Sequence, residues 1–238
     1  MYLYGYHACR MALLNPTRLI EKVLITDQRL LQGLPSLGKI KWEVIERKSL
    51  ESRLPMGAVH QGIALMVQPL NVADLSFLAK DVSAHQCVIV LDQVSDPHNV
   101  GAVLRSAAVF GAKAVIMTER HAPKESGTLA KSACGALEVV PLCRVKNLAQ
   151  ALEHLREMGF WCVGLSEKGK QFLDQIDLKG KIALVFGSEG DGMRRRTQEM
   201  CDFQVRLPVA GQFSTLNISN AAAISLYETF RQQQAIRI

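Results

Sequence analysis

Hydrophobic residues form two different patterns along the 238-residue chain. From residue 86 onward, short continuous apolar runs recur, which is the pattern of parallel strands buried on both faces. These runs are residues 87–91, 114–117, 139–142, 161–165 and 182–186. Helical patterns separate them, at residues 100–110, 148–158 and 219–231. Strands that alternate with helices predict an α/β fold, in which helices cover both faces of a parallel sheet.

The first 67 residues have shorter elements. Their pattern predicts a helix at residues 7–14, strands at 22–26, 42–46 and 63–67, and a short helix at 49–54. The segment that follows is polar and mixed, with one short helical pattern at residues 74–79. We therefore interpret residues 1–67 as a small α/β domain, residues 68–82 as a linker, and residues 83–238 as a second, larger domain.

The composition narrows the class of protein. Hydrophobic residues make up 48% of the chain and charged residues 21%, which excludes wholesale disorder. The net charge is +6, and residues 1–67 carry +4 of it, which suits a polyanionic partner without identifying one. The six cysteines form no CxxC and no cluster with histidine, so we expect reduced thiols and no metal. Neither a signal-peptide pattern nor an apolar run of membrane-spanning length occurs, so we expect a cytoplasmic protein, or one of an organelle matrix after removal of a leader.

Residues 91–106 form the first of three segments that can carry chemistry. A strand, a turn at Asp96-Pro97 and a helix follow one another, and Asn99 can cap that helix. Arg105 comes one turn after Gly101. We expect its side chain to cross the bare surface of Gly101 toward the free N–H groups of the helix, where a phosphate can bind. The same spacing also fits a solvated arginine paired with a carboxylate.

The second segment, residues 186–196, contains three glycines after an apolar strand. Glycines at 187, 190 and 192 let the backbone approach a ligand, and Glu189 between them can point into a cleft or simply occupy an exposed turn. The segment is neither G-x-G-x-x-G nor a P-loop, so a nucleotide-dependent dehydrogenase is not favoured. In the third segment, residues 205–223, Ser214, Thr215 and Asn217 precede a helix of small residues, which they can cap.

Taken in order, the three segments resemble the motifs of the SpoU (TrmH-like) family of RNA 2′-O-ribose methyltransferases. The motifs are D-x-x-x-D-P-x-N-x-G-x-x-x-R, G-x-E-G-x-G-M and L-P-V-A-G…S-L-N-x-S. Thr215 stands where the family has the serine of S-L-N, so the hydroxyl there belongs to a threonine. The first domain is similar to the L30e-like substrate-binding domain of this family, with residues 4–8 near its start and residues 57–62 near its end.

The resemblance implies a SPOUT-type parallel sheet that ends in a C-terminal trefoil knot, a rare exception to unknotted topology. It implies S-adenosylmethionine as methyl donor, held by Gly187, Leu207 and Leu216, and no metal. The positions that it assigns to the catalytic site are Asn99, Arg105, Glu189, Ser214 and Asn217. It also implies a homodimer in which the C-terminal helices meet and the active site is completed across the interface. On the last helix we expect the interface to use a small apolar face, formed by Ile218, Ala221, Ala222 and Ser225.

The implied substrate is a ribose in structured RNA, by the overall resemblance a guanosine of 23S rRNA. Two alternatives remain, a ribose of tRNA and a non-catalytic RNA-binding factor in ribosome assembly. The family proposal gives the proton of the 2′-hydroxyl to the arginine, here Arg105. Because an arginine pKa lies above about 12, Arg105 is better suited to hold a phosphate and to stabilise a developing alkoxide.

Overall fold

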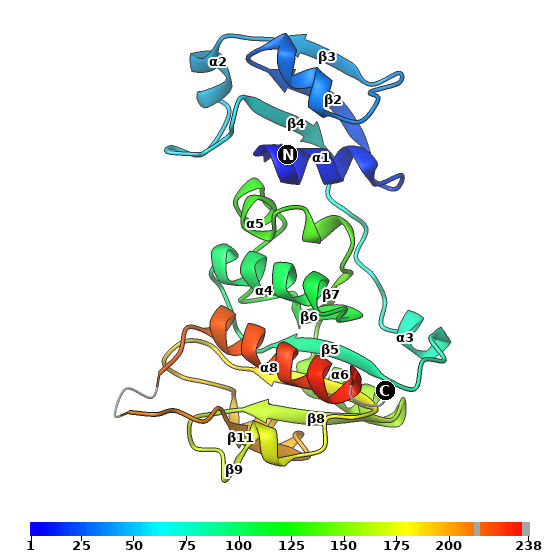
Figure 1. Ribbon diagram of the computed structural model, residues 1–238, viewed down its shortest axis with the longest axis vertical. Coiled ribbons are helices and arrows are strands. Elements are labelled where there is room, and N and C mark those ends of the chain that lie inside the picture. The colour runs from blue at the N-terminus through cyan, green and yellow to red at the C-terminus, as the bar shows by residue number, and fades with distance from the viewer. Residues whose placement is uncertain (212–214, 235–238) are drawn as a thin grey trace.

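The chain folds into two sheets that are stacked along the long axis of the molecule, as the computed structural model in Figure 1 shows. The structure describes residues 1–211 and 215–234. The upper sheet has the order β1 (Tyr2–Tyr4), β4 (Ile63–Val67), β2 (Ile20–Ile25) and β3 (Lys41–Val44). Strand β4 is antiparallel to both neighbours, and β2 is parallel to β3. Helices α1 (Tyr6–Leu14) and α2 (Arg47–Glu51) and the 3-10 turn η1 (Gln28–Gly33) complete this unit.

The lower sheet has seven strands, and every neighbouring pair is parallel. Its order is β7 (Leu142–Val145), β6 (Ala114–Thr118), β5 (Gln86–Leu91), β10 (Lys181–Phe186), β8 (Phe160–Leu165), β11 (Phe203–Arg206) and β9 (Gln171–Phe172). The prediction of an α/β fold with a parallel sheet is confirmed.

Helices cover both faces of this sheet, so its strands alternate between two apolar clusters. Ile89 of β5 packs on the side of α4 (Pro97–Val109) and α8 (Ile218–Gln234), and Val90 packs on the side of α6 (Leu148–Glu157). All six residues of β5 are buried, as a continuous apolar run predicts. The remaining elements are short: α3 (Phe77–Lys80), α5 (Gly127–Ala133), η2 (Ala136–Glu138), η3 (Leu173–Gln175) and α7 (Arg195–Glu199).

Two predicted elements lie elsewhere, and proline explains both shifts. The strand expected at residues 139–142 begins only at Leu142, because Pro141 has no N–H for a ladder hydrogen bond. The helix expected at residues 49–54 is α2, which ends at Glu51, ahead of Pro55. The residue before a proline avoids the helical conformation. Strand β1 and helix α5 were not predicted.

The two sheets belong to one packed body, because helix α5 fills the space between them (Figure 1). A single apolar cluster joins Cys9 and Ala12 of α1 to Leu129 and Ala133 of α5. The backbones approach so closely that a Cβ on Gly127 would lie 2.4 Å from the carbonyl oxygen of Tyr2. The segment between the sheets is also packed, since Leu75 and Leu78 are buried against the lower sheet.

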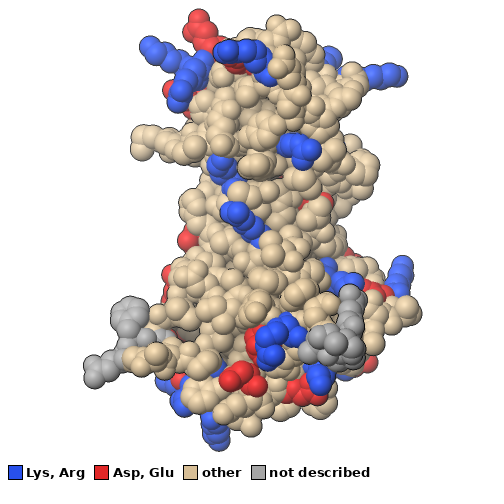
Figure 2. Space-filling model, in the orientation of Figure 1, with Lys and Arg blue, Asp and Glu red and all other residues tan. Residues whose placement is uncertain are grey.

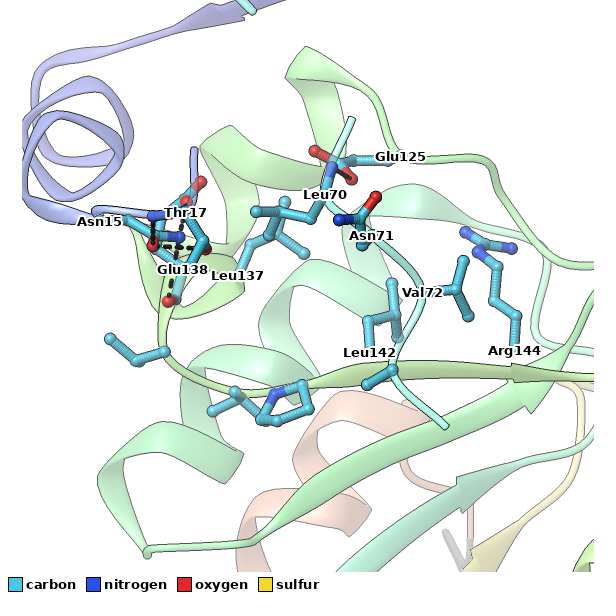
Figure 3. A pocket seen from close by; sticks show the side chains of 14 residues that line it. Asn15, Thr17, Leu70, Asn71, Val72, Glu125, Leu137, Glu138, Leu142 and Arg144 are labelled. Atoms are coloured by element: carbon cyan, nitrogen blue, oxygen red, sulfur yellow. Dashed lines mark hydrogen bonds between the residues drawn. The ribbon is translucent and has the colours of Figure 1, made fainter. Parts of the chain in front are cut away.

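A buried ion cluster lies beside this contact. The Arg18 side chain, fully excluded from solvent, places one guanidinium nitrogen 2.5 Å from Glu138 and another 2.6 Å from Glu125. It also donates to the carbonyl oxygen of Gln68 at 3.0 Å, while Asn15 donates to Glu138 at 2.8 Å. Burial alone would lower the pKa of Arg18, but its hydrogen bonds to the two glutamates outweigh burial and raise that pKa. Figure 3 shows Asn15, Glu125 and Glu138 around an adjoining cavity of about 330 Å³.

Among the residues that the structure describes, no helix is both long enough and apolar enough to cross a membrane.

Replacement of Arg18 should destabilise the whole chain. In Arg18→Met, two buried carboxylates lose their counterion, so we expect the free energy of unfolding to fall by about 3 kcal/mol or more. Arg29→Met is the matched control, because Arg29 pairs with Asp27 on the surface with 85% of its side chain exposed, and such pairs contribute at most about 1 kcal/mol. Urea unfolding followed by tryptophan fluorescence measures both variants, with Trp42 in the upper sheet and Trp161 in the lower. Equal losses in the two variants would contradict the prediction.

Candidate active site

The three motif segments meet at one edge of the lower sheet. Strands β5, β10, β8 and β11 are consecutive neighbours and all parallel, so their carboxyl ends lie at the same edge. The first segment follows β5, the second follows β10 and the third follows β11. In open α/β sheets, ligands bind outside the carboxyl ends of the strands. The order of the strands therefore gathers the candidate residues.

The first segment enters helix α4 through Asp96, which accepts a hydrogen bond from the His98 N–H at 2.9 Å and caps the helix. Pro97 is the first helical residue, the position where a missing N–H costs nothing. The prediction that Asn99 caps this helix was wrong, because Asp96 fills that role. Asn99 lies in the first turn and is 8% exposed, with its amide group available for other partners.

The second segment forms a tight loop. Ser188 and Gly192 exchange two backbone hydrogen bonds, at 3.1 and 3.0 Å. A Cβ on Gly187 would lie 2.0 Å from the backbone of Gly192 and Met193, so the loop itself requires glycine there. Gly190 and Gly192 have φ values of +92° and +70°, which side chains rarely allow. A bulky residue at 187 would thus distort this loop directly, whatever the loop binds.

Asp92 ties this loop to the first segment. Its carboxylate is completely buried and accepts from the Arg194 backbone N–H at 2.9 Å and from the Arg194 guanidinium at 2.8 Å. A buried carboxylate needs such a partner, because desolvation of an unpaired charge is costly. We assigned no role to Asp92 from the sequence. The signal was present, since a charged residue directly follows the apolar run at residues 87–91.

One residue from each motif contributes to a hydrogen-bonded cluster. Glu189 Oε1 accepts from the side-chain amides of Asn99 at 3.0 Å and Asn217 at 2.8 Å. Asn217 also donates to Asn99 Oδ1 at 3.0 Å, while its own Oδ1 accepts from the Ser219 N–H at 2.8 Å and so caps α8. Because Glu189 and Asn217 are exposed at the surface, the cluster presents a fixed carboxylate and two amides to a ligand.

Arg105 lies outside this cluster. It follows Asn99 by six residues, about 9 Å along the helix axis, and its guanidinium is 3.7 Å from the Cys134 Sγ. The expected path over Gly101 was wrong, because α5 covers that glycine and a Cβ there would lie 2.5 Å from Ser132 Cβ. The alternative carboxylate partner is also not found, since within residues 1–211 and 215–234 Arg105 makes no ion pair.

The positions that we expect to hold the methyl donor follow strands β10 and β11. Gly187 directly follows β10 and is half-buried, and Leu207 directly follows β11 and packs against the core. Leu216 is exposed beside Asn217. Ser214 lies outside the described residues. In the part of the chain that the structure describes, no group of three histidine, cysteine or acidic side chains is arranged to hold a metal ion.

The last helix does not present the face that we expected at an interface. Ile218, Ala222 and Ser225 are buried inside the chain, where α8 packs on α4 and β10. The exposed apolar side of α8 is formed instead by Ile224, Tyr227 and Phe230, and Val109 of α4 adjoins them through Phe110.

The fold and this cluster define an α/β protein with a polar candidate site at the carboxyl edge of a parallel sheet. A family model described as the SpoU rRNA Methylase family matches residues 86–227, and one described as RNA 2′-O ribose methyltransferase substrate binding matches residues 2–73. The chain belongs to the SpoU rRNA methylase family.

Full-length relatives and solved structures agree with this assignment. The chain is 42% identical to the 23S rRNA (guanosine-2′-O-)-methyltransferase RlmB of Vibrio vulnificus, over 98% of both chains. It resembles the crystal structure of the SpoU methyltransferase AviRb from Streptomyces viridochromogenes, with a TM-score of 0.82, 22% identity and coverage of 99% of this chain and 90% of that one. The complex of AviRb with the cofactor AdoMet matches with a TM-score of 0.81 and 24% identity, over 98% and 89% of the two chains. These two structures support the fold.

The Asp92–Arg194 contact should control the loop at residues 187–193. Arg194→Met removes the guanidinium that balances the buried charge of Asp92 and leaves only the backbone N–H of residue 194 as its partner. We therefore expect faster hydrogen exchange at the Ser188 and Gly192 amides, by about 10-fold for each 1.4 kcal/mol lost. Arg195→Met is the control, because Arg195 pairs with Glu199 at the exposed surface. Unchanged exchange in the Arg194 variant would refute the role of this contact.

Proposed function

We propose that this chain transfers the methyl group of S-adenosylmethionine to a ribose 2′-hydroxyl in structured RNA, at a guanosine of 23S rRNA. The observation that carries the proposal is the cluster of Asn99, Glu189 and Asn217, one residue from each motif. The near-complete alignment with a 23S rRNA guanosine 2′-O-methyltransferase gives the substrate. The intact cluster also argues against a non-catalytic assembly factor.

S-adenosylmethionine fits the loops that follow β10 and β11. In the described residues, a Cβ on Gly190 or Gly192 would meet no atom within 4 Å, so the loop at 187–193 is open there. Leu207 and Leu216 belong to the segment after β11, at the same edge of the sheet. Backbone groups with apolar side chains around them suit a flat adenine ring. When bound, this donor supplies an electrophilic methyl group on a sulfonium. The residues that would hold it are Gly187, Leu207 and Leu216.

The cluster is suited to hold the ribose that accepts the methyl group. Glu189 is anchored through Oε1 by two amides, which leaves its other oxygen to accept a hydrogen bond from a ribose hydroxyl. Such a contact would orient the 2′-hydroxyl oxygen toward the methyl carbon. Transfer would form an O–C bond as the S–C bond breaks, and the 2′-hydroxyl proton would pass to solvent at this exposed site. Because the leaving group is neutral, alignment contributes most of the acceleration. Ser214, in the third motif, is a further candidate for this site.

Arg105 is proposed to complete the site of a second copy. Arg105 and Val109 are four residues apart and so share one side of α4, and Val109 is 69% exposed. Val109 continues into the exposed apolar side of α8 formed by Ile224, Tyr227 and Phe230. An exposed apolar patch of this kind marks an interaction site. A homodimer that covers the patch would bring each Arg105 to the boundary between the copies, where it can hold an RNA phosphate.

The two parts of the chain would have different functions, RNA selection and methyl transfer. Residues 1–67, an L30e-like unit with most of the net positive charge, would select the RNA, and residues 68–82 would link it to the catalytic part. Residues 83–238 would carry the methyl transfer, with a C-terminal trefoil knot as in other SPOUT-type enzymes. We expect the protein to act in the cytoplasm, where ribosomal RNA is processed.

The proposed function is tested with labelled S-adenosylmethionine and in vitro-transcribed 23S rRNA, with the methylated nucleotide mapped by mass spectrometry. We expect one labelled site, a 2′-O-methylguanosine. Methylation of tRNA instead, or binding of the donor without transfer to any RNA, would overturn the proposal.

Arg105 should affect the rate of transfer and not the binding of the donor. We expect Arg105→Ala to lower the single-turnover rate by about 100-fold or more at saturating RNA, as for loss of a key hydrogen-bond donor. Arg105→Lys should not restore the rate, because lysine keeps the charge but lacks the planar fork. Calorimetry of donor binding is the control. A wild-type rate in Arg105→Ala would mean that Arg105 is only a solvated arginine.

A homodimer should have twice the 26.3 kDa chain mass in light scattering. We expect Tyr227→Glu to give monomers, and Trp42→Glu, which changes an exposed aromatic residue of the upper sheet, to leave the dimer intact. Mixing inactive Arg105→Ala and Asn217→Ala proteins then tests the shared site. If each site combines Arg105 of one copy with Asn217 of the other, random exchange should restore about a quarter of the wild-type activity. No recovery in exchanged dimers would show that the two residues act within one chain.

A further inference from the structure

A line of polar side chains crosses the surface between the candidate active site and the upper sheet. His98, next to Asn99 on α4, shares a 3.0 Å hydrogen bond with the Ser132 hydroxyl on α5. The next residue of α5, Lys131, donates to Gln61 Oε1 of the upper unit at 2.7 Å. Gln61 is fixed in turn, because the same oxygen accepts from the Tyr6 backbone N–H at 3.0 Å. We call His98, Ser132 and Lys131 the α4–α5 ridge.

Close backbone contacts fix the position of the ridge. Ser132 lies against Gly101 of α4, where a Cβ would come within 2.5 Å of the serine Cβ. Lys131 lies across Gly5, where a Cβ would come within 2.5 Å of the lysine Cδ. At Gly101 the α5 backbone also lies within 3 Å of that Cβ, so a larger residue would not fit, and at Gly5 the φ of +88° favours glycine. The lysine therefore has a defined place at the junction of the two units, which is unusual for such a flexible side chain.

The charge of Lys131 is not neutralised by the protein. In the described residues Lys131 makes no ion pair within 4.0 Å, whereas Arg18 and Arg194 are each bound to buried carboxylates. Figure 2 shows an excess of positive charge on one face, where the waist between the upper and lower parts carries lysine and arginine groups and few acidic ones. An ordered cation with a neutral hydrogen-bond partner remains available to an external anion.

We propose that the α4–α5 ridge holds the RNA backbone between the nucleotide in the active site and the RNA bound by the upper unit, with Lys131 contacting a phosphate. This inference rests on the proposed function. The ridge begins one residue from the cluster of Asn99, Glu189 and Asn217 and ends on the upper unit. The ridge therefore lies on a direct surface path between the two parts, which an RNA that contacts both would follow. His98 and Ser132 add hydrogen-bonding groups that can meet ribose or phosphate oxygens without reading the base.

The test is the salt dependence of binding to in vitro-transcribed 23S rRNA, measured by filter binding with the full chain. Each lost phosphate contact makes the slope of log Kd against log salt less steep by about 0.7 to 1. We expect this change in Lys131→Gln and its recovery in Lys131→Arg. The methylation assay should show a raised KM for RNA with an unchanged kcat. Lys179→Gln is the charge-matched control, since residue 179 precedes β10, at the opposite edge of the sheet.

A second control separates phosphate binding from support of the junction. Gln61→Asn shortens the partner of Lys131 but keeps the positive charge, and asparagine tolerates the positive φ of 55° at this position. We expect its salt slope to match the wild type. An unchanged slope in Lys131→Gln, or equal changes in Lys131→Gln and either control, would overturn the inference. Failure of the wild-type chain to bind or methylate 23S rRNA would instead overturn the proposed function.

Discussion

A single buried carboxylate organises the candidate active site. Asp92 directly follows strand β5, and its carboxylate has no access to water. The Arg194 guanidinium balances that charge, and the Arg194 backbone N–H adds a second hydrogen bond. The Asp92–Arg194 contact therefore joins the loop after β10 to the loop after β5. It also holds in place the glycine-rich turn that contains Glu189. The order of the strands brings the loops to one edge, and the Asp92–Arg194 contact sets the position of one loop against the other.

A buried ion cluster also joins segments distant in sequence at the junction of the upper and lower units. Arg18 lies more than 100 residues along the chain from each of its two glutamates. No local sequence pattern around these three residues predicts that they are in contact. Together with the apolar contact of α1 and α5, this cluster makes the upper unit a fixed extension of the catalytic part. For an enzyme that must recognise a large folded RNA and act on one ribose, a fixed distance between recognition and chemistry is useful, because misplacement of the reacting atoms by about 1 Å is costly.

The parallel sheet could be predicted because buried strands and amphipathic helices have periodic signals that depend only on neighbouring residues. The motifs of Asn99, Glu189 and Asn217 were likewise visible, since each lies at a turn with characteristic glycines or capping residues. Helix α5 was missed because its small residues, Gly127 to Ala133, give little amphipathic pattern, although Ser126 is a helix cap. The predicted path of the Arg105 side chain was wrong for a related reason. Helix α5 covers Gly101, and because α5 was not predicted, its contact with α4 could not be predicted either.

The charges of the site explain why residues beyond the cluster are needed. Glu189 is a fixed carboxylate, and an RNA phosphate that approaches it meets repulsion that two neutral amides do not remove. For the proposed binding of a ribose at the cluster, nearby cations that hold its phosphates would offset this repulsion. Arg18 and Arg194 are bound to internal carboxylates, whereas in the described residues Arg105 and Lys131 make no ion pair. Arg105 lies on α4 and Lys131 on α5, away from Glu189. The fold thus separates the group proposed to bind the hydroxyl from the groups proposed to bind the phosphates, which is an arrangement that suits a polyanionic substrate with a neutral reacting group.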